Sequence, residues 1–379
     1  VSPMNDKKMQ TGFWWDEKCF WHSGGAYAFI MPVGGLVQPL AAGGLPENPE
    51  TKRRLKNLLH VTGLIQELAV SSAPEASEEE LRRVHPKSYL DAFKRLSDDK
   101  GGELGERTPF GPGGYDIAAL SAGLATGALR SILSGNQRNA YALSRPPGHH
   151  CLPDKPMGYC LLANIAIAIE AAFAEKHAGR VAVIDWDVHH GNGTEAIFYD
   201  RSDVLTISLH QENNYPRDSG KVEDRGTGRG EGYNINIPMI PGTGHVGYLH
   251  AFDRIVLPAL RAYQPDVIIV ACGFDASGVD PLSRMLATSK TFSEMTRLTM
   301  QAADELCAGK LLLVHEGGYS EAHVPFCGHA VIAMLAGSSI VAPDPIEIRL
   351  DFQQPNPDFT AYQIAAIDRM AEIFDQRKF

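Results

Sequence analysis

The chain has 379 residues, of which 44% are hydrophobic and 21% are charged, which is typical of a folded protein with a large core and excludes a disordered chain. The 45 acidic residues outnumber the 35 basic ones, and the formal net charge is −10. We therefore expect no nucleic acid and no membrane among its partners, because both present anionic surfaces.

The N-terminal residues and the cysteines predict the cellular location of the protein. The first residues are polar and lead into an acidic, aromatic stretch at 14–17, unlike a secretory signal, and no run of eighteen apolar residues occurs. No CxxC spacing occurs, so we expect reduced, mostly buried thiols at all six cysteines: Cys19, Cys151, Cys160, Cys272, Cys307 and Cys327. These features predict a cytoplasmic location.

In chain order, strand and helix patterns alternate. Apolar, β-branched runs predict strands at 181–184, 204–209, 267–272 and 310–314. Apolar residues spaced three and four apart predict helices at 115–133, 162–176, 246–263 and 291–307, and a C-terminal helical segment at about 359–377. This order predicts an α/β fold with a central, mainly parallel sheet flanked by helices on both faces. We expect a single domain over 1–379, with its core at about 15–340.

Polar residues cluster directly after the predicted strands. The clusters comprise His149 and His150, the run Asp185, Asp187, His189 and His190, then His210, then Asp275, and finally Glu316 and Tyr319. In open parallel sheets, ligands bind at the carboxyl ends of the strands. We therefore expect these side chains to converge in one crevice.

Asp187, His189 and Asp275 have the composition of a metal site. Asp187 and His189 share one face of an extended segment, and Asp275 follows another strand. Two carboxylates and one imidazole suit one Zn²⁺ with an open position for water, and Fe²⁺ or Co²⁺ would also fit. Any one of these aspartates, taken alone, is better explained as a strand-end cap or surface pair; the three together favour a metal.

The tandem His149 and His150 follow two prolines and a glycine, which fix an unusual backbone. Such a pair beside a metal can supply an acid and a base if different partners separate their pKa values. Asp185 and Asn192 are the expected partners.

The stretch HEGGYS at 315–320 adds the last candidate group. Gly317 and Gly318 let the backbone pass close to a ligand, and the Tyr319 hydroxyl can then stabilise an oxyanion. Taken alone, the stretch is explained nearly as well by a tight turn with a packed tyrosine. Its position after a strand and opposite the predicted metal site favours the functional interpretation.

These residues belong to longer motifs that resemble the histone deacetylase family. The motifs are RPPGHH, GYC, DWDVHHGNGT, TISLH, GFDAS with a following DP, and EGGYS, in this order from 145 to 320. The similarity is greater to class II enzymes and bacterial histone deacetylase-like amidohydrolases, which place asparagine at position 192 and EGGY at 316–319. PETKRRLKNLL near the N-terminus and PFCG at 325–328 extend the resemblance over most of the chain.

The resemblance implies a single arginase/deacetylase-like domain and a role for each motif residue. Zinc ligands fall on Asp187, His189 and Asp275, the histidine pair on His149 and His150, and the carbonyl-polarising tyrosine on Tyr319. Gly158, Tyr159 and Tyr215 would line an acyl-lysine tunnel. Potassium would be held by Asp185, Ser208 and main-chain oxygens of Asp187, His189 and Leu209, and a second ion by main-chain oxygens around Phe198, Arg201, Val204 and Tyr233.

The predicted function is a zinc-dependent deacetylase that hydrolyses the amide of acyl-lysine-like or small acylamide substrates. His150, neutral beside Asn192, would take the proton of the attacking water, while His149, held by Asp185, would act electrostatically. Resemblance to related bacterial enzymes implies a homo-oligomer, a dimer or tetramer.

Three alternatives remain. An acetylpolyamine amidohydrolase would place a glutamate after DP, where this chain has Leu282. A ureohydrolase with two Mn²⁺ ions would need a second aspartate where Ser277 stands. A silent acyl-lysine-binding module would not need the complete set of catalytic residue types.

Overall fold

The computed structural model describes residues 9–25, 27–28, 30–32, 37 and 44–375. Its centre is one sheet of eight strands, all paired in parallel, in the order β4-β1-β5-β10-β9-β6-β7-β8. In chain order the strands are β1 Gly12–Trp14, β4 Ala69–Ser71, β5 Asn139–Ala142, β6 Val181–Asp185, β7 Val204–Gln211, β8 Asn234–Met239, β9 Val267–Cys272 and β10 Leu311–His315. A small antiparallel pair, β2 Tyr27–Ala28 and β3 Met31–Pro32, lies apart from it.

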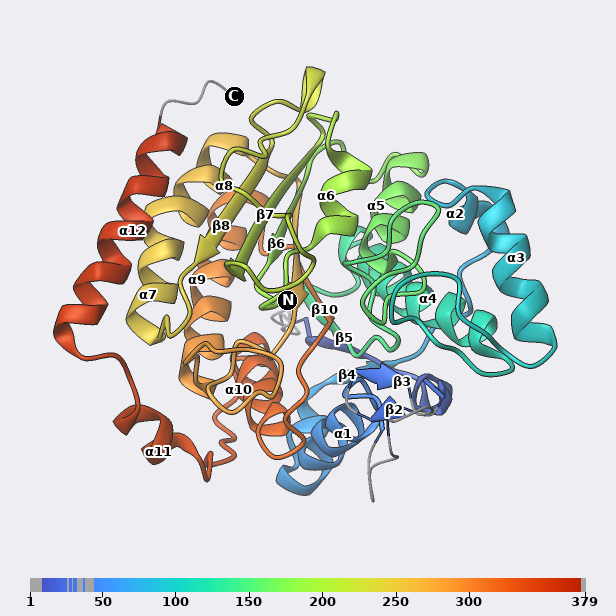
Figure 1. Ribbon diagram of the computed structural model, residues 1–379, viewed down its shortest axis with the longest axis horizontal. Coiled ribbons are helices and arrows are strands. Elements are labelled where there is room, and N and C mark those ends of the chain that lie inside the picture. Colours follow the sequence, from blue (N-terminus) through green and yellow to red (C-terminus); the bar gives the residue numbers. More distant parts are fainter. Residues whose placement is uncertain (1–8, 26, 29, 33–36, 38–43, 376–379) are drawn as a thin grey trace, which may run out of the picture.

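Helices cover both faces of the sheet. Figure 1 shows α7, α8, α9 and α12 on one side of the central strands and α4, α5 and α6 on the other. The helices are α1 Glu50–Thr62, α2 Glu78–Arg82, α3 Lys87–Asp98, α4 Gly114–Leu133, α5 Asn164–Ala174, α6 Asn192–Phe198, α7 His245–Ala251, α8 Leu257–Tyr263, α9 Ser289–Cys307, α10 Val324–Ala336, α11 Glu347–Phe352 and α12 Pro357–Asp375. Short 3₁₀ turns lie at Glu17–Trp21, Leu64–Glu67 and Gly228–Gly230. The predicted α/β architecture is confirmed.

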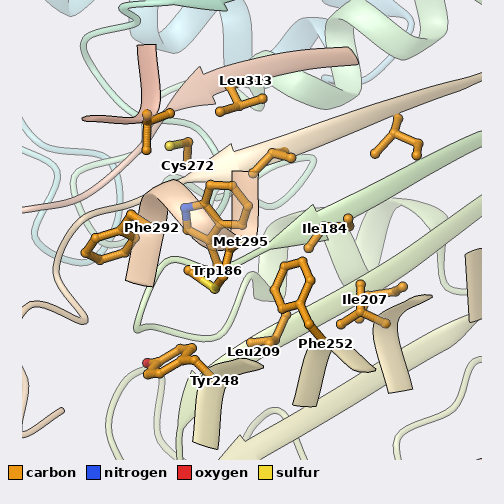
Figure 2. Packing of buried hydrophobic residues seen from close by; sticks show 14 of the residues in the cluster. Ile184, Trp186, Ile207, Leu209, Tyr248, Phe252, Cys272, Phe292, Met295 and Leu313 are labelled. Carbon is orange, nitrogen blue, oxygen red and sulfur yellow. The ribbon is translucent and has the colours of Figure 1, made fainter. Parts of the chain in front are cut away.

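The central strands divide their side chains between two cores. In β6, Ala182 and Ile184 pack with α7, α9 and α12, whereas Val181 and Val183 pack with α4 and α5. Since both faces are buried, these strands read as continuous apolar runs instead of alternating patterns. Figure 2 shows the first core, in which the fully buried Trp186 lies among residues from several elements, including Ile184, Phe252, Cys272 and Met295.

The alternation continues past the ends of β6 and β9, and this places the polar residues. Trp186 and Val188 extend the buried series of β6, so the intervening Asp187 and His189 take the opposite direction. After β9, Phe274 continues the same core, and Asp275 takes the opposite direction. The apolar residues that continue β6 and β9 thus fix the directions of the Asp187 and Asp275 side chains.

The four predicted strands and the predicted helices are present, with shifted ends, and four strands of the central sheet, together with the β2–β3 pair, were missed. β1 and β4 have three residues each, and β5 has four, which is too short for a clear pattern. In β8, the Asn234 and Asn236 side chains donate to the carboxylate of Glu195, so polar residues fill one face of a buried strand.

Two helical predictions differ in detail. The helix predicted at 246–263 contains a π-helical turn at Phe252–Val256 between α7 and α8, and the segment predicted at 359–377 is α12, with residues 376–377 outside the described part.

α4 alone, within the described part of the chain, is long and apolar enough to cross a membrane, and 67% of it is buried inside the fold. It is a core helix that packs against α5. The six cysteines are buried and free, as predicted.

Candidate active site

Side chains from β6, β9 and β10 meet at the carboxyl edge of the sheet. Because all eight strands are parallel, the segments after them emerge on the same side. Asp187 and His189 follow β6, Asp275 follows β9, and Tyr319 follows β10. The convergence expected from the sequence is therefore present for these residues.

Asp187, His189 and Asp275 form a compact buried cluster. The Nδ1 atom of His189 lies 3.1 Å from Oδ1 of Asp187 and 3.0 Å from Oδ2 of Asp275, and one ligand atom from each residue lies within 4.8 Å of the others. Both carboxylates are fully buried. Three donors of this kind around one point fit a divalent cation.

Gly317 keeps the backbone close to this cluster. Its N–H donates to Oδ2 of Asp187 at 2.8 Å, and a Cβ atom here would lie 2.3 Å from Oδ2 of Asp275. Any side chain at this position would displace the carboxylates, which explains the glycine.

The cluster places two buried carboxylates close together, so it is unfavourable unless a positive charge lies beside them. Burial and the neighbouring Asp187 carboxylate raise the pKa of Asp275 to about 6. Burial disfavours the charged imidazole of His189, but hydrogen bonds to both carboxylates outweigh it and raise its pKa to about 10. A proton on His189 thus neutralises the carboxylates, and a metal ion would take that proton's place, because a histidine ligand binds in its neutral form.

His149 and His150 are adjacent in sequence but have different partners. Nδ1 of His149 lies 2.8 Å from Oδ2 of Asp185, and Nδ1 of His150 lies 2.7 Å from Oδ1 of Asn192. The two ring centroids are 3.9 Å apart. The structure therefore pairs each histidine with one of the two residues expected from the sequence.

These partners push the pKa values of the histidines apart. Burial disfavours the charged form of His149, but Asp187 and Asp185 outweigh it and raise its pKa well above the ordinary value. Burial, together with the neighbouring His149, lowers the pKa of His150 well below the ordinary value. At neutral pH the pair of His149 and His150 thus combines one charged imidazole with one neutral imidazole.

Tyr319 faces this group from the segment after β10. Its ring centroid is 6.4 Å from that of His189 and 5.9 Å from that of Tyr159. Its N–H donates to Oδ2 of Asp280 at 2.8 Å. Burial and the charge of Asp275 raise the pKa of the hydroxyl well above its ordinary value, so it remains a hydrogen-bond donor.

The cluster opens into a cavity of about 120 Å³. Its walls include the predicted tunnel residues Gly158, Tyr159, Tyr215 and Leu282, together with His150, His189, Tyr319, Ile30, Arg107 and Asn214. Gly158 has φ +49°, and a Cβ atom there would lie 2.5 Å from Cδ2 of His150. Glycine at this position thus keeps the passage beside His150 open.

Of the residues predicted to hold potassium, Asp185 and Ser208 lie beside the site, whereas the second set lies at the amino ends of β7 and β8. Asp185 and Ser208 are neighbours across the β6–β7 ladder, and both line a small cavity of about 10 Å³. At the second predicted position, the carbonyl of Phe198 accepts from the N–H of Arg201, and the carbonyl of Tyr233 accepts from that of Thr206. The two potassium sites, with Val204 and Leu209, stay predictions.

Two histidines expected in the crevice point elsewhere. His190 bonds to Glu195 and Ser219, and His210 bonds to Ser208 and the carbonyl of Gly220. Their ring nitrogens thus bond to α6, to β7 and to the loop at 219–220 instead of joining the cluster of Asp187, His189 and Asp275.

Other residues of the site have roles that the sequence did not predict. The buried carboxylate of Glu316 accepts from the N–H groups of Gly148 and His149 at 2.7 and 3.1 Å, so it fixes the loop that carries both histidines. A structural role for Glu316 could have been predicted, because this carboxylate follows a buried strand directly. Arg107, Ile30 and Asn214 lie in loops without a motif, so only the fold brings them to the cavity.

Ser277 occupies the position where a second metal would need a carboxylate. Its Oγ lies 2.6 Å from Nδ1 of His323, and Nε2 of His323 lies 2.7 Å from Oδ2 of Asp344. This hydroxyl is thus engaged in a separate network.

Comparison with known proteins agrees with this geometry. Residues 45–335 match the histone deacetylase domain family. The chain is 55% identical over 365 residues to a histone deacetylase-like amidohydrolase of Pseudomonas aeruginosa, covering 96% of each chain. It is 39% identical over 268 residues to a probable deacetylase of Archaeoglobus fulgidus, covering 70% of this chain and 74% of that one. The crystal structure of an HDA15 HD domain superposes with a TM-score of 0.79 at 31% identity, covering 98% of this chain and 100% of that one. The chain therefore belongs to the histone deacetylase domain family.

Proposed function

We propose that the protein is a zinc-dependent deacetylase that hydrolyses the amide bond of acyl-lysine-like or small acylamide substrates. The observation that carries this proposal is that Asp187, His189 and Asp275 converge at the end of a cavity that His150 and Tyr319 also line. The Pseudomonas relative, whose name describes an amidohydrolase, supports the reaction type.

A divalent cation held by Asp187, His189 and Asp275 would polarise the amide carbonyl and make a bound water more acidic. Zinc is the expected ion because two carboxylates and one imidazole leave a fourth position open in a tetrahedral site. Ser277, bonded to His323, supplies no carboxylate for a second ion, which disfavours a binuclear ureohydrolase.

The chain's own groups divide the proton transfers between them. His150 is neutral at physiological pH, so it accepts a proton from water as the water attacks the amide carbon. The Tyr319 hydroxyl donates to the oxygen that becomes negatively charged. His149 is held charged by Asp185 and stabilises negative charge nearby, and one of the two histidines returns a proton to the departing amine.

The uncharged wall residue Leu282 favours acyl-lysine-like or other small acylamides over acetylpolyamines, whose second ammonium it cannot attract. The cytoplasmic location, the homo-oligomer and the bound potassium remain part of the proposal.

Metal analysis of the purified protein, followed by a competition panel, tests the function. We expect one zinc per chain and turnover of acetyl-lysine peptides that a hydroxamate chelator abolishes. Two metals per chain would favour the ureohydrolase alternative. Higher catalytic efficiency on acetylspermidine or acetylputrescine than on acetyl-lysine peptides would favour the polyamine alternative, and metal binding without turnover of any acylamide would favour a silent binding module.

A further inference from the structure

Arg107 is the one permanently charged side chain among the ten described residues that line the cavity. It lies in the loop between α3 and α4, far in sequence from the motifs that form the rest of the site. The other lining residues are aromatic, aliphatic, glycine, asparagine or histidine. A fixed positive charge in so narrow and apolar a passage affects which substrates can enter.

The backbone around Arg107 is fixed to the cavity wall. Arg107 has φ +57°, in the left-handed region that residues with side chains rarely occupy. Its carbonyl accepts from the N–H of Tyr159 at 3.0 Å, and the carbonyl of Glu106 accepts from the N–H of Gly158 at 3.0 Å. These two bonds join the loop to the segment that forms one wall, and they hold an uncommon conformation that sets the direction of the arginine.

The ring of Tyr215 separates the guanidinium of Arg107 from His150. The guanidinium Cζ lies 5.3 Å from the ring centroid of Tyr215, and the same ring lies 5.0 Å from that of His150. Within the described part of the chain, the guanidinium has no carboxylate within 4.0 Å. Its N–H groups are therefore available to a ligand in the outer cavity.

Two nearby glutamates, within the described part of the chain, form no ion pair with Arg107. The carboxylate of Glu103 accepts from the N–H of Thr108 at 2.8 Å and from the hydroxyl of Tyr27 at 3.4 Å. Glu106 is exposed and does not line the cavity. Among the described residues that line the cavity, Arg107 thus supplies the permanent charge that a substrate can contact.

We propose that Arg107 determines specificity by selecting acylamides whose amine side ends in a carboxylate. This inference rests on the proposed function: with the amide at His150 and Tyr319, the amine chain runs outward past Tyr215 toward Arg107. A terminal carboxylate there forms a charge-assisted, bidentate pair with the guanidinium, whereas a terminal ammonium is repelled. The substrate class is that of acylated amino acids, with the acyl group on the distal amine.

Three substrates of matched length test the proposal: 6-acetamidohexanoate, 6-acetamidohexanamide and N-acetylcadaverine, which end in a carboxylate, a neutral amide and an ammonium. We expect the zinc-loaded wild-type protein to show kcat/KM values in that order, with the carboxylate preferred over the neutral amide about 10- to 100-fold. Arg107→Met should abolish the preference, and Arg107→Glu should reverse it toward N-acetylcadaverine. Arg369→Met, which removes an exposed charge on α12, should retain the wild-type order.

Ratios within one variant are independent of how much protein is correctly folded. A wild-type protein that turns over the neutral amide without preferring the carboxylate, or a preference that persists in Arg107→Met and Arg107→Glu, would overturn the role of Arg107 and leave the proposed function intact. Failure of the zinc-loaded wild type to hydrolyse any of the three while it turns over an acetyl-lysine peptide would overturn this inference alone, and failure on the peptide as well would refute the proposed function.

Discussion

Two clusters each take one residue from the segment after β9, and they have similar residue types but different hydrogen-bond arrangements. The first is Asp187, His189 and Asp275, and the second is Ser277, His323 and Asp344. In the second cluster each nitrogen of His323 has its own partner, at 2.6 Å to Ser277 and 2.7 Å to Asp344. In the first, two carboxylates compete for the same Nδ1 atom of His189.

The difference shows that residue types alone do not define a binding site. The Ser277–His323–Asp344 chain is a satisfied network, and it joins the loop after β9 to the segments before α10 and α11. The Asp187–His189–Asp275 cluster has more acceptors than donors and borders the cavity through His189. We expect substitutions in the first cluster to affect activity and those in the second to affect stability.

The largest expected effect is that of Asp275→Asn. Removing one charged ligand should lower the metal content well below one ion per chain and reduce kcat/KM on the order of 10³-fold, because metal-ion stabilisation of the transition state is worth several kcal/mol. Metal analysis and the acetyl-lysine assay check this. Asp253→Asn, a matched change at an exposed aspartate, should leave both unchanged. Full activity in Asp275→Asn would contradict the metal-site assignment.

Tyr319→Phe should reduce kcat about 10²- to 10³-fold, the loss typical for one oxyanion donor. Metal content should stay at the wild-type value, since the hydroxyl is not one of the three ligands. Steady-state kinetics with metal analysis separate the two quantities, and Tyr362→Phe on α12 is the control. A variant that keeps wild-type turnover would remove Tyr319 from the mechanism.

Asn192→Asp should change the pH dependence more than the maximal rate. A carboxylate beside His150 favours the charged imidazole, so the pKa of His150 rises. Because His150 acts in its neutral form, the acidic limb of the kcat/KM profile should move upward by about one to three pH units. An acidic limb that lies at the same pH in the wild type and the variant would show that His150 is not the base.

Asp344→Asn should have the smallest effect on activity, within a few-fold, and should lower the free energy of unfolding by about 1–3 kcal/mol. Burial raises the pKa of Asp344, but the hydrogen bond from His323 outweighs it and lowers the pKa below the ordinary value. The stabilisation is therefore complete above the unfolded pKa, about 3.9, and is lost as the pH falls through the folded value.

Denaturant unfolding of both proteins at several pH values measures this difference. It should be full at pH 7 and shrink toward zero below about pH 3. A variant with wild-type stability and strongly reduced activity would instead place Asp344 in the functional site.

The convergence of the candidate metal ligands was predictable because strand alternation fixes local direction. Asp187 and His189 are two residues apart in an extended segment, and the apolar Trp186 and Val188 between and beside them are buried in the core. The same alternation failed for His190 and His210, because their partners lie in α6 and in the loop at 219–220, and the local pattern around each histidine does not encode those contacts. β8 was missed for a related reason, since its asparagines are satisfied by Glu195 on another element.

The sequence by itself determined the parallel α/β architecture and the residues at the carboxyl edge, because apolar periodicity and strand alternation are local properties of the chain. Only the tertiary structure gave His190 and His210 partners outside the crevice, and it alone brought Arg107 to the cavity wall. Those outcomes depend on distances between segments far apart in sequence, which packing sets and local pattern does not.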